Sequence, residues 1–168
     1  TPCGRIMQKT SEIRRNEDLI IASVFNDPAG VLPFVYGGNV IKVQSPDGRY
    51  LLDVLKYVYK AKNELSVVAV ELTIDNINLE NDKKQILKDR LTSSLTLNIP
   101  ENDFQKVASF ALSEIDDITF DSKLNNQLTD LQKQVEKGSN REEVLEGILS
   151  LYNNLATNLD REEKRSLS

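Results

Sequence analysis

Apolar residues in the first half of the chain fall into short runs separated by polar turns, a pattern typical of a small β-sheet. Three runs are rich in β-branched residues: "DLIIASVF" over 18–25, "VLPFVY" over 31–36 and "ELSVVAVELTID" over 64–75. Runs of this length and composition predict buried strands. Because proline cannot donate a ladder hydrogen bond, Pro33 places the second strand at an edge or a bulge.

Gly37 and Gly38 separate "VLPFVY" from the next apolar run, "NVIKVQ". Adjacent glycines supply the positive φ angles of a tight hairpin, so the two runs are expected to pair as antiparallel strands. The glycines match neither GxxxxGK[ST] nor GxGxxG, the patterns that place backbone N–H groups around a phosphate. We therefore interpret them as a turn.

The segment from 49 to 63 has the polar pattern of a helix. Its polar residues recur at spacings of four, three, four and three, which form one stripe on a helix but change face on a strand. They are Arg49, Asp53, Lys56, Lys60 and Asn63. Ser45 before Pro46 is typical of an N-cap followed by proline in the first turn, so "SPDG" predicts a strand-to-helix corner.

The second half changes to a helical period. Helices are expected at about 80–94 and at 101–116, where apolar residues recur every three or four positions. After "DDITFDS", the spacing of Leu124, Leu128, Leu131 and Val135 predicts a third helix with Gly138 as its C-cap. Ser139 or Asn140 is expected to cap a fourth helix, which forms an αα-hairpin with the third over 121–160.

These patterns together predict an α+β fold. It has a small, mostly antiparallel N-terminal sheet of about four strands with one helix packed on it, followed by three or four C-terminal helices. The expected organisation is a flexible or helical lead-in over 1–17, a β-rich half over 18–78, a helical half over 79–160 that packs with it as one domain, and a frayed tail over 161–168.

The composition excludes several kinds of chemistry. The 168 residues contain no histidine and a single cysteine, Cys3. Mechanisms that need an imidazole base or ligand are therefore excluded, as are an internal disulfide and a multi-cysteine zinc site. No apolar run reaches the roughly 18–20 residues of a membrane span. We expect a soluble chain, with an intracellular location favoured and the compartment left open.

Net charge is −5, and the whole excess lies in residues 79–168, which hold twelve basic and seventeen acidic side chains. This sign disfavours nucleic acid as a partner. One local exception is the mixture of basic and aromatic residues on the helix over 49–63. A second hypothesis is therefore a nucleic-acid, lipid-headgroup or small-ligand site on that helix, formed by Arg49, Lys56, Tyr57 and Lys60.

Carboxylate-based metal chemistry is a remote alternative. The expected order of elements is also that of the restriction-endonuclease-like core, but Val40 stands two places before Lys42, where a carboxylate ligand is needed. The stretch "DNINLENDKK" has alternating oxygen donors, yet it lacks the central glycine and the final acid of a calcium loop. The sequence therefore predicts no metal, no cofactor and no catalytic residue.

The broadest apolar face lies on the last predicted helix. It is formed by Val144, Leu145, Ile148, Leu149, Leu151, Tyr152, Leu155 and Leu159. Such a face either closes the helical layer or meets another molecule. We expect a non-enzymatic adaptor or complex subunit that binds another protein chain, in a hetero- or homo-oligomer, through Ile148, Leu151, Tyr152, Leu155 and Leu159.

Overall fold

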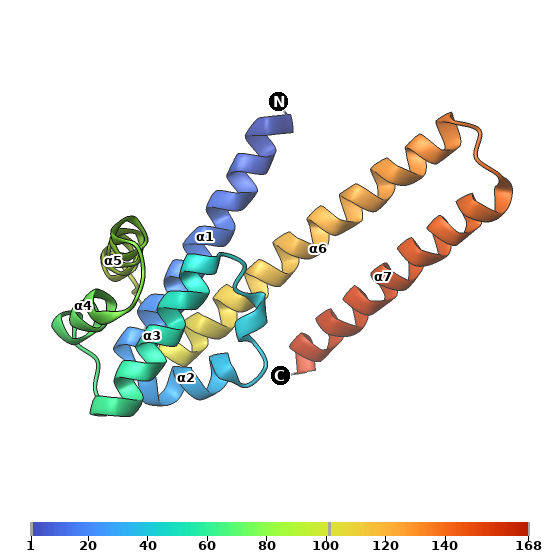
Figure 1. Ribbon diagram of the computed structural model, residues 1–168. Helices are drawn as coiled ribbons and strands as arrows, with labels where there is room; N and C mark the ends of the chain where they lie inside the picture. Colours follow the sequence, from blue (N-terminus) through green and yellow to red (C-terminus); the bar gives the residue numbers. More distant parts are fainter. Residues whose placement is uncertain (1, 101, 168) are drawn as a thin grey trace. The chain divides into compact units, whose positions relative to one another are not determined.

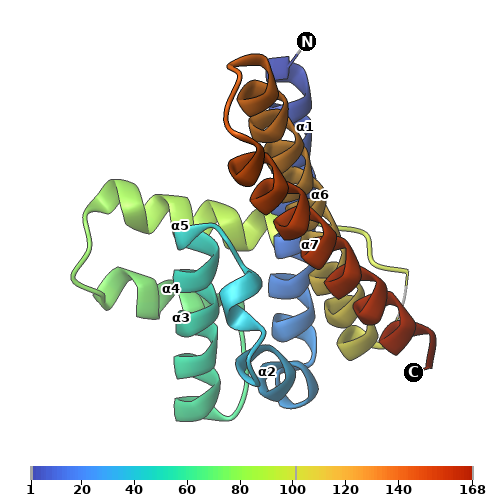
Figure 2. The same cartoon turned by 90° about the vertical axis from the view of Figure 1, so that its right-hand side faces the viewer.

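The computed structural model describes the backbone of residues 2–100 and 102–167, and the side chains of 9–100, 102–157 and 159. This part of the chain is helical throughout and contains no strand (Figures 1 and 2). Its elements are α1 (Pro2–Asn26), α2 (Pro28–Tyr36), the 3-10 helix η1 (Val40–Lys42), α3 (Pro46–Lys62), α4 (Val67–Asn76), α5 (Asn81–Leu95), α6 (Phe104–Glu136) and α7 (Arg141–Leu167).

The predicted N-terminal sheet, and with it the α+β class, is wrong. The apolar run 18–25 is the last part of α1, 31–36 lies in α2, 39–44 holds η1 and 64–75 leads into α4. A short apolar run has no period of its own and fits a buried helix as well as a buried strand. In α1 every residue from Ile20 to Val24 is buried, so this run shows no two-residue alternation of buried and exposed side chains. The nuclease-like order of strands disappears with the sheet.

Capping residues explain why these runs are helical. Asp27 precedes Pro28, and its carboxylate accepts a hydrogen bond from the Gly30 backbone N–H at 3.2 Å. The Ser66 hydroxyl accepts one from the Ala69 N–H, also at 3.2 Å. Each cap satisfies a backbone donor that has no partner in the first turn of a helix. Once a helix has started, burial of its apolar face outweighs the weak strand preference of valine and isoleucine.

Several local predictions of helix ends are confirmed. Ser45 caps α3, and its hydroxyl accepts from the Gly48 N–H at 3.3 Å. Gly138 has φ +71° at the end of α6, and the Asn140 side chain caps α7 by accepting from the Glu143 N–H at 2.9 Å. The predicted break after 116 is wrong, because α6 continues from Phe104 to Glu136. Gly38, with φ +100°, turns the chain between α2 and η1 and not between two strands.

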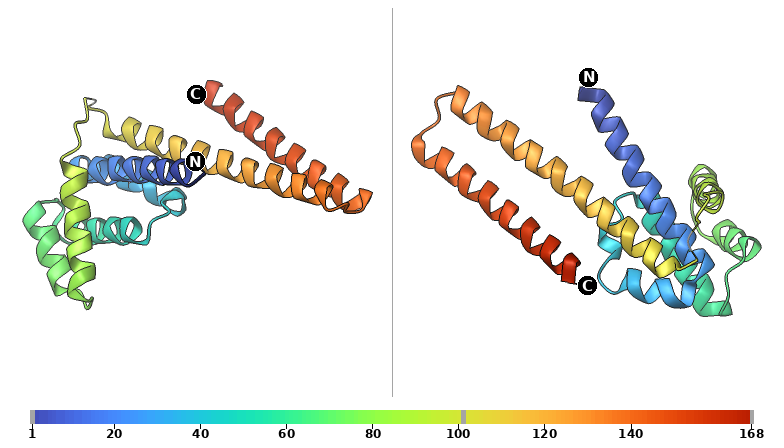
Figure 3. Two further views of the ribbon diagram at one scale, coloured as in Figure 1. Left: turned by 90° about the horizontal axis from the view of Figure 1, so that it is seen from above. Right: turned by 180° about the vertical axis from the view of Figure 1, so that it is seen from behind.

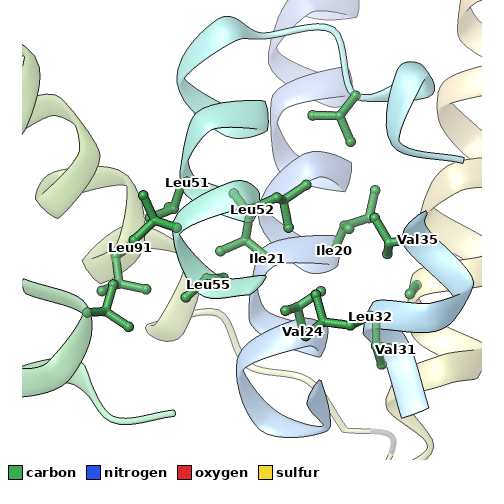
Figure 4. Packing of buried hydrophobic residues seen from close by; sticks show 14 of the residues in the cluster. Ile20, Ile21, Val24, Val31, Leu32, Val35, Leu51, Leu52, Leu55 and Leu91 are labelled. Atoms are coloured by element: carbon green, nitrogen blue, oxygen red, sulfur yellow. The ribbon is translucent and has the colours of Figure 1, made fainter. Parts of the chain in front are cut away.

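The chain divides into two compact units, Thr1–Asp116 and Asp117–Ser168, with the boundary inside α6. The first unit contains the hydrophobic core. Figure 4 shows the contributions of four helices to this core. Ile20, Ile21 and Val24 come from α1, and Val31, Leu32 and Val35 come from α2. Leu51, Leu52 and Leu55 come from α3, and Leu91 comes from α5. The first part of α6 adds Ala108, Ala111, Leu112 and Ile115.

The second unit is the predicted helical hairpin, formed by the end of α6 and by α7 (Figure 3). The loop 137–140 reverses the chain. Backbone hydrogen bonds from Gly138 N–H to the Val135 carbonyl at 3.2 Å, and from Ser139 N–H to the Gln134 carbonyl at 3.0 Å, close the end of α6. The positive φ of Gly138 makes this closure possible without a strained side chain.

Candidate functional site

The apolar stripe predicted for partner binding lies on α7, and most of it is exposed. Ile148, Tyr152, Leu155 and Leu159 have 46%, 68%, 41% and 62% of their surface accessible. Leu151, the fifth predicted residue, is half-buried. We call Ile148, Tyr152, Leu155 and Leu159 the α7 stripe. They share one side of the helix, because their spacings are four, three and four.

Leu151 lies at the edge of the α7 stripe towards α6, three residues after Ile148 and four before Leu155. Gly147 approaches the end of the Leu131 side chain so closely that an added Cβ would stand 2.8 Å from its Cδ1 atom. Two turns further on, the Asn154 amide donates to the Gln127 side-chain oxygen at 2.7 Å. Leu151 lies between these two contacts in the helical repeat, so it borders both the α7 stripe and the seam between α6 and α7.

The hairpin has no core of its own. Among the described side chains from 117 to 157 and at 159, none is fully buried. Exposed apolar residues occur on both helices: Leu128, Val135, Leu145, Ile148, Leu149, Tyr152, Leu155 and Leu159. Helices in proteins take most of their stability from burial of such a face. The hairpin therefore leaves much of its apolar surface uncovered.

The α7 stripe is also free of charge. No Asp, Glu, Lys or Arg occurs between Gly147 and Leu159, although 28% of the chain is charged. Glu142, Glu143 and Glu146 precede this segment and Asp160 and Arg161 follow it. Depletion of charge and the presence of an aromatic residue such as Tyr152 are typical of the centre of a protein interface, which a polar rim surrounds.

The second predicted site, on α3, is largely occupied by contacts within the protein. Arg49 donates to the Ile41 carbonyl at 2.7 Å and also to the Val43 carbonyl, so it holds the η1 segment in place. The Lys56 ammonium lies 4.1 Å from the centre of the Tyr36 ring, a cation–π contact. Tyr57 and Lys60 are exposed. The α3 helix thus brings the four residues onto one element, with two of their cations engaged.

Tyr36 links α2 to the same helix. Its hydroxyl donates to the Asp53 carboxylate at 2.5 Å. Burial raises the pKa of Tyr36 above its usual range, and the hydrogen bond and the negative charge of Asp53 raise it further. The phenol therefore stays protonated and acts as a clamp between α2 and α3.

A buried charge cluster that no local sequence pattern indicates joins α1, α3 and α5. Arg90 on α5 is 2% exposed. It donates to Asp18 at 2.5 Å, to Asp47 at 3.0 Å and to Glu17 at 3.2 Å. The remaining donors reach the Ser45 hydroxyl at 3.1 Å and the Arg14 carbonyl at 3.4 Å. All five N–H groups of the guanidinium are thus directed to acceptors.

Glu17 is the centre of the acidic side of this cluster. It is 1% exposed, and its carboxylate also accepts hydrogen bonds from the Gln44 N–H at 2.5 Å, the Ser45 N–H at 3.1 Å and the Ser45 hydroxyl at 2.7 Å. A buried carboxylate is tolerated only when it is paired and hydrogen-bonded in this way. Glu17 thereby fixes the segment that leads into α3 against α1.

The two ends of this cluster have shifted pKa values. Burial alone favours the neutral form of Arg90, but the hydrogen bond and charge of Asp18, with those of Asp47 and Glu17, raise its pKa. Burial also raises the pKa of Asp47, but the hydrogen bond and charge of Arg90 and the charge of Arg14 outweigh it and lower the pKa. The carboxylates of Glu17, Asp18 and Asp47 therefore all pair with Arg90, and these ion pairs hold α1, α3 and α5 together.

Within the described residues, no group of three or more histidine, cysteine, aspartate and glutamate side chains is placed to hold a metal ion. The same part of the chain contains no helix long and apolar enough to span a membrane. Cys3 lies outside the described side chains.

Comparison with protein-family models, with curated proteins and with solved structures found no match to this chain.

Proposed function

We propose that the protein is a non-catalytic interaction module in which the α7 stripe binds an apolar helical surface of another protein chain. The observation that carries the proposal is the composition and burial of the hairpin. The side chains of the α7 stripe stand at helical spacing, are uncharged and are 41–68% exposed, and no described side chain of the hairpin is fully buried. An exposed apolar face of this kind typically marks a binding site. A helix is the complementary shape, because it can fit its own side chains between positions spaced by three and four.

The size of the expected effect follows from burial. Covering the exposed part of Leu155 or Leu159 contributes on the order of 1 kcal/mol each. Placing a glutamate at the same position adds the penalty of burying an unpaired charge. Because about 1.4 kcal/mol corresponds to a tenfold change in affinity, Leu155→Glu with Leu159→Glu should weaken the complex by roughly 100-fold or more.

The test compares this double variant with a matched control. Val68 and Leu72 on α4 are as exposed as the stripe and also stand four residues apart, so Val68→Glu with Leu72→Glu makes the same change of charge elsewhere. Far-UV circular dichroism checks that both variants keep their helix content. Sedimentation of each purified chain detects self-association, and pull-down from the native source with quantitative mass spectrometry detects a different partner.

The proposal expects an association, with itself or with another chain, that the control retains and the stripe variant loses. If wild type, control and stripe variant sediment alike and capture the same proteins, the α7 stripe is not a binding surface. Loss of helix content in the stripe variant alone would assign these side chains to the fold of the hairpin and would also count against the proposal.

A ligand site on α3 receives less support. Arg49 and Lys56 already have partners within the protein, so mainly Lys60 and Tyr57 remain to meet a nucleic acid or a lipid headgroup. Salt-dependent binding of an oligonucleotide or of anionic vesicles, lost in a Lys56→Glu, Lys60→Glu variant, is the result that this alternative needs.

A further inference from the structure

A groove of about 720 Å³ lies between α1, α3 and α5 on the first unit. Most of its lining is apolar or aromatic and comes from Pro46, Tyr50, Leu79, Ile86 and Leu87. Ile86 is 49% exposed, whereas Leu87 and Leu91 on the same helix enter the core. A hollow with a mainly apolar lining is suited to receive an apolar group.

Two of the three charged side chains that line the groove are cations. Arg14 and Lys83 line it together with a single carboxylate, that of Asp47. Asp47 is already bound by Arg90 at 3.0 Å, and Arg14 touches it only at 3.5 Å while keeping about half of its side chain exposed. Lys83 is exposed and forms no salt bridge with the described residues. The groove thus combines two available cations with an apolar lining.

The groove differs in this respect from the chain as a whole, whose net charge is −5. The net charge repels an acidic ligand, so the two cations that line the groove favour its binding there over the rest of the surface. Arg14 has guanidinium donors left over after its contact with Asp47, and Lys83 adds a second point charge. Two cations beside apolar lining residues fit a carboxylate next to a large apolar side chain.

We infer that the groove binds an acidic peptide segment of a partner protein. A phenylalanine or leucine of that segment lies on Ile86 and Tyr50, and flanking aspartate or glutamate side chains pair with Arg14 and Lys83. This site lies in the first unit and does not depend on the α7 stripe, so the chain has two separate surfaces for other proteins.

The test uses two rhodamine-labelled hexapeptides, Asp-Glu-Phe-Leu-Asp-Glu and its neutral counterpart Asn-Gln-Phe-Leu-Asn-Gln, and measures fluorescence anisotropy at low salt. The full chain should bind the acidic peptide more tightly than the neutral one, and added salt should weaken the acidic complex. Equal binding of both peptides, or no binding of the acidic one at millimolar protein, overturns the proposal.

Substitutions then locate the site. Lys83→Glu should weaken binding of the acidic peptide about tenfold, and Ile86→Ala about fivefold through lost apolar contact. The controls are Lys62→Glu, at the end of α3, and Leu72→Ala on α4, both outside the residues that line the groove. If the groove variants bind like their controls, the peptide binds elsewhere and the assignment is wrong.

The variant Leu155→Glu, Leu159→Glu separates the two proposals. It should bind the acidic peptide as the wild type does, because its changes lie on α7. A parallel loss of peptide binding in this variant would assign the peptide to the α7 stripe and contradict the groove.

Discussion

Replacing Arg90 by methionine is expected to destabilise the first unit strongly. Methionine has a similar length and fills the space, but it cannot donate to any of the acceptors that surround Arg90. Glu17 then remains buried with its negative charge and without a cation. Its bonds to the Gln44 and Ser45 N–H groups persist, but they do not neutralise it.

The magnitude follows from the fate of Glu17. Removing one partner of a buried ion pair costs about 3–5 kcal/mol, because the other charge is left in a poorly solvated place. For a unit of this size, each kcal/mol lowers the melting temperature by about 3–4 °C, so the loss corresponds to roughly 10–20 °C. Asp18 and Asp47 have 15% and 21% of their side chains accessible, so they can recover more water than Glu17 and contribute less to this loss.

Urea unfolding followed by far-UV circular dichroism measures this free energy, and amide hydrogen exchange assigns the loss to α1, α3 and α5. The matched control is Lys88→Met on the same helix, because Lys88 pairs with Asp75 at 2.6 Å at the surface. The control should unfold close to the wild type. In the Arg90→Met background, Glu17→Gln should cost much less than it does alone, since the two residues are coupled.

The reasoning is refuted if Arg90→Met unfolds within about 1 kcal/mol of the wild type, a change expected of an exposed ion pair. Additive effects of Arg90→Met and Glu17→Gln would likewise show that the two side chains do not act as a pair.

Further predictions concern single contacts. Arg90 lowers the pKa of Asp47 in the folded protein. Asp47 therefore stabilises the fold above the usual aspartate pKa, and this stabilisation is lost as the pH falls through the lower folded pKa. The free energy of unfolding of Asp47→Asn should fall less steeply below about pH 4 than that of the wild type. Absorbance titration should find one of the five tyrosines ionising later than the others, and Tyr36→Phe should remove that late step and cost about 1 kcal/mol. Gly138→Ala should cost about 1 kcal/mol because φ is +71° there, and Gly138→Asn less, as thermal unfolding of the hairpin will show.

Helix ends were the most predictable part of this fold. The residues at these ends act on near neighbours in the sequence, so a short stretch of sequence is enough to predict their roles. They are Ser45 with Pro46, Gly138 and Asn140. Asp27–Pro28 carries the same kind of signal as Ser45–Pro46 and marks the start of α2. This N-cap signal favours a helix over a strand for residues 31–36.

The predicted sheet is wrong because β-branched composition is weak evidence of strands. Val67, Val68 and Val70 lie in one turn of α4, where Val70 is buried and Val68 faces solvent. Which of several valines in a run becomes buried is decided by the helices packed against it. That information comes from residues distant in the sequence, and a short run does not contain it.

The candidate surfaces differ in how far the sequence predicts them. The apolar stripe on α7 is evident from its period. The seam between α6 and α7, which Leu151 borders, involves Gly147 and Leu131, and these two residues belong to different helices. The Arg90 cluster joins residues 43 to 73 positions apart. No local pattern distinguishes Arg90 from the surface cations of α5, so only the packing of the helices reveals it.

The most direct test of the proposed function is amide hydrogen exchange over residues 141–159, measured in the purified chain alone and in the complex recovered from its native source. Binding through the α7 stripe predicts fast exchange in the isolated chain, where this segment has no buried side chain among those described, and slowing by at least tenfold in the complex. Equal exchange of α7 in both samples, with protection appearing elsewhere on the chain, would contradict the account.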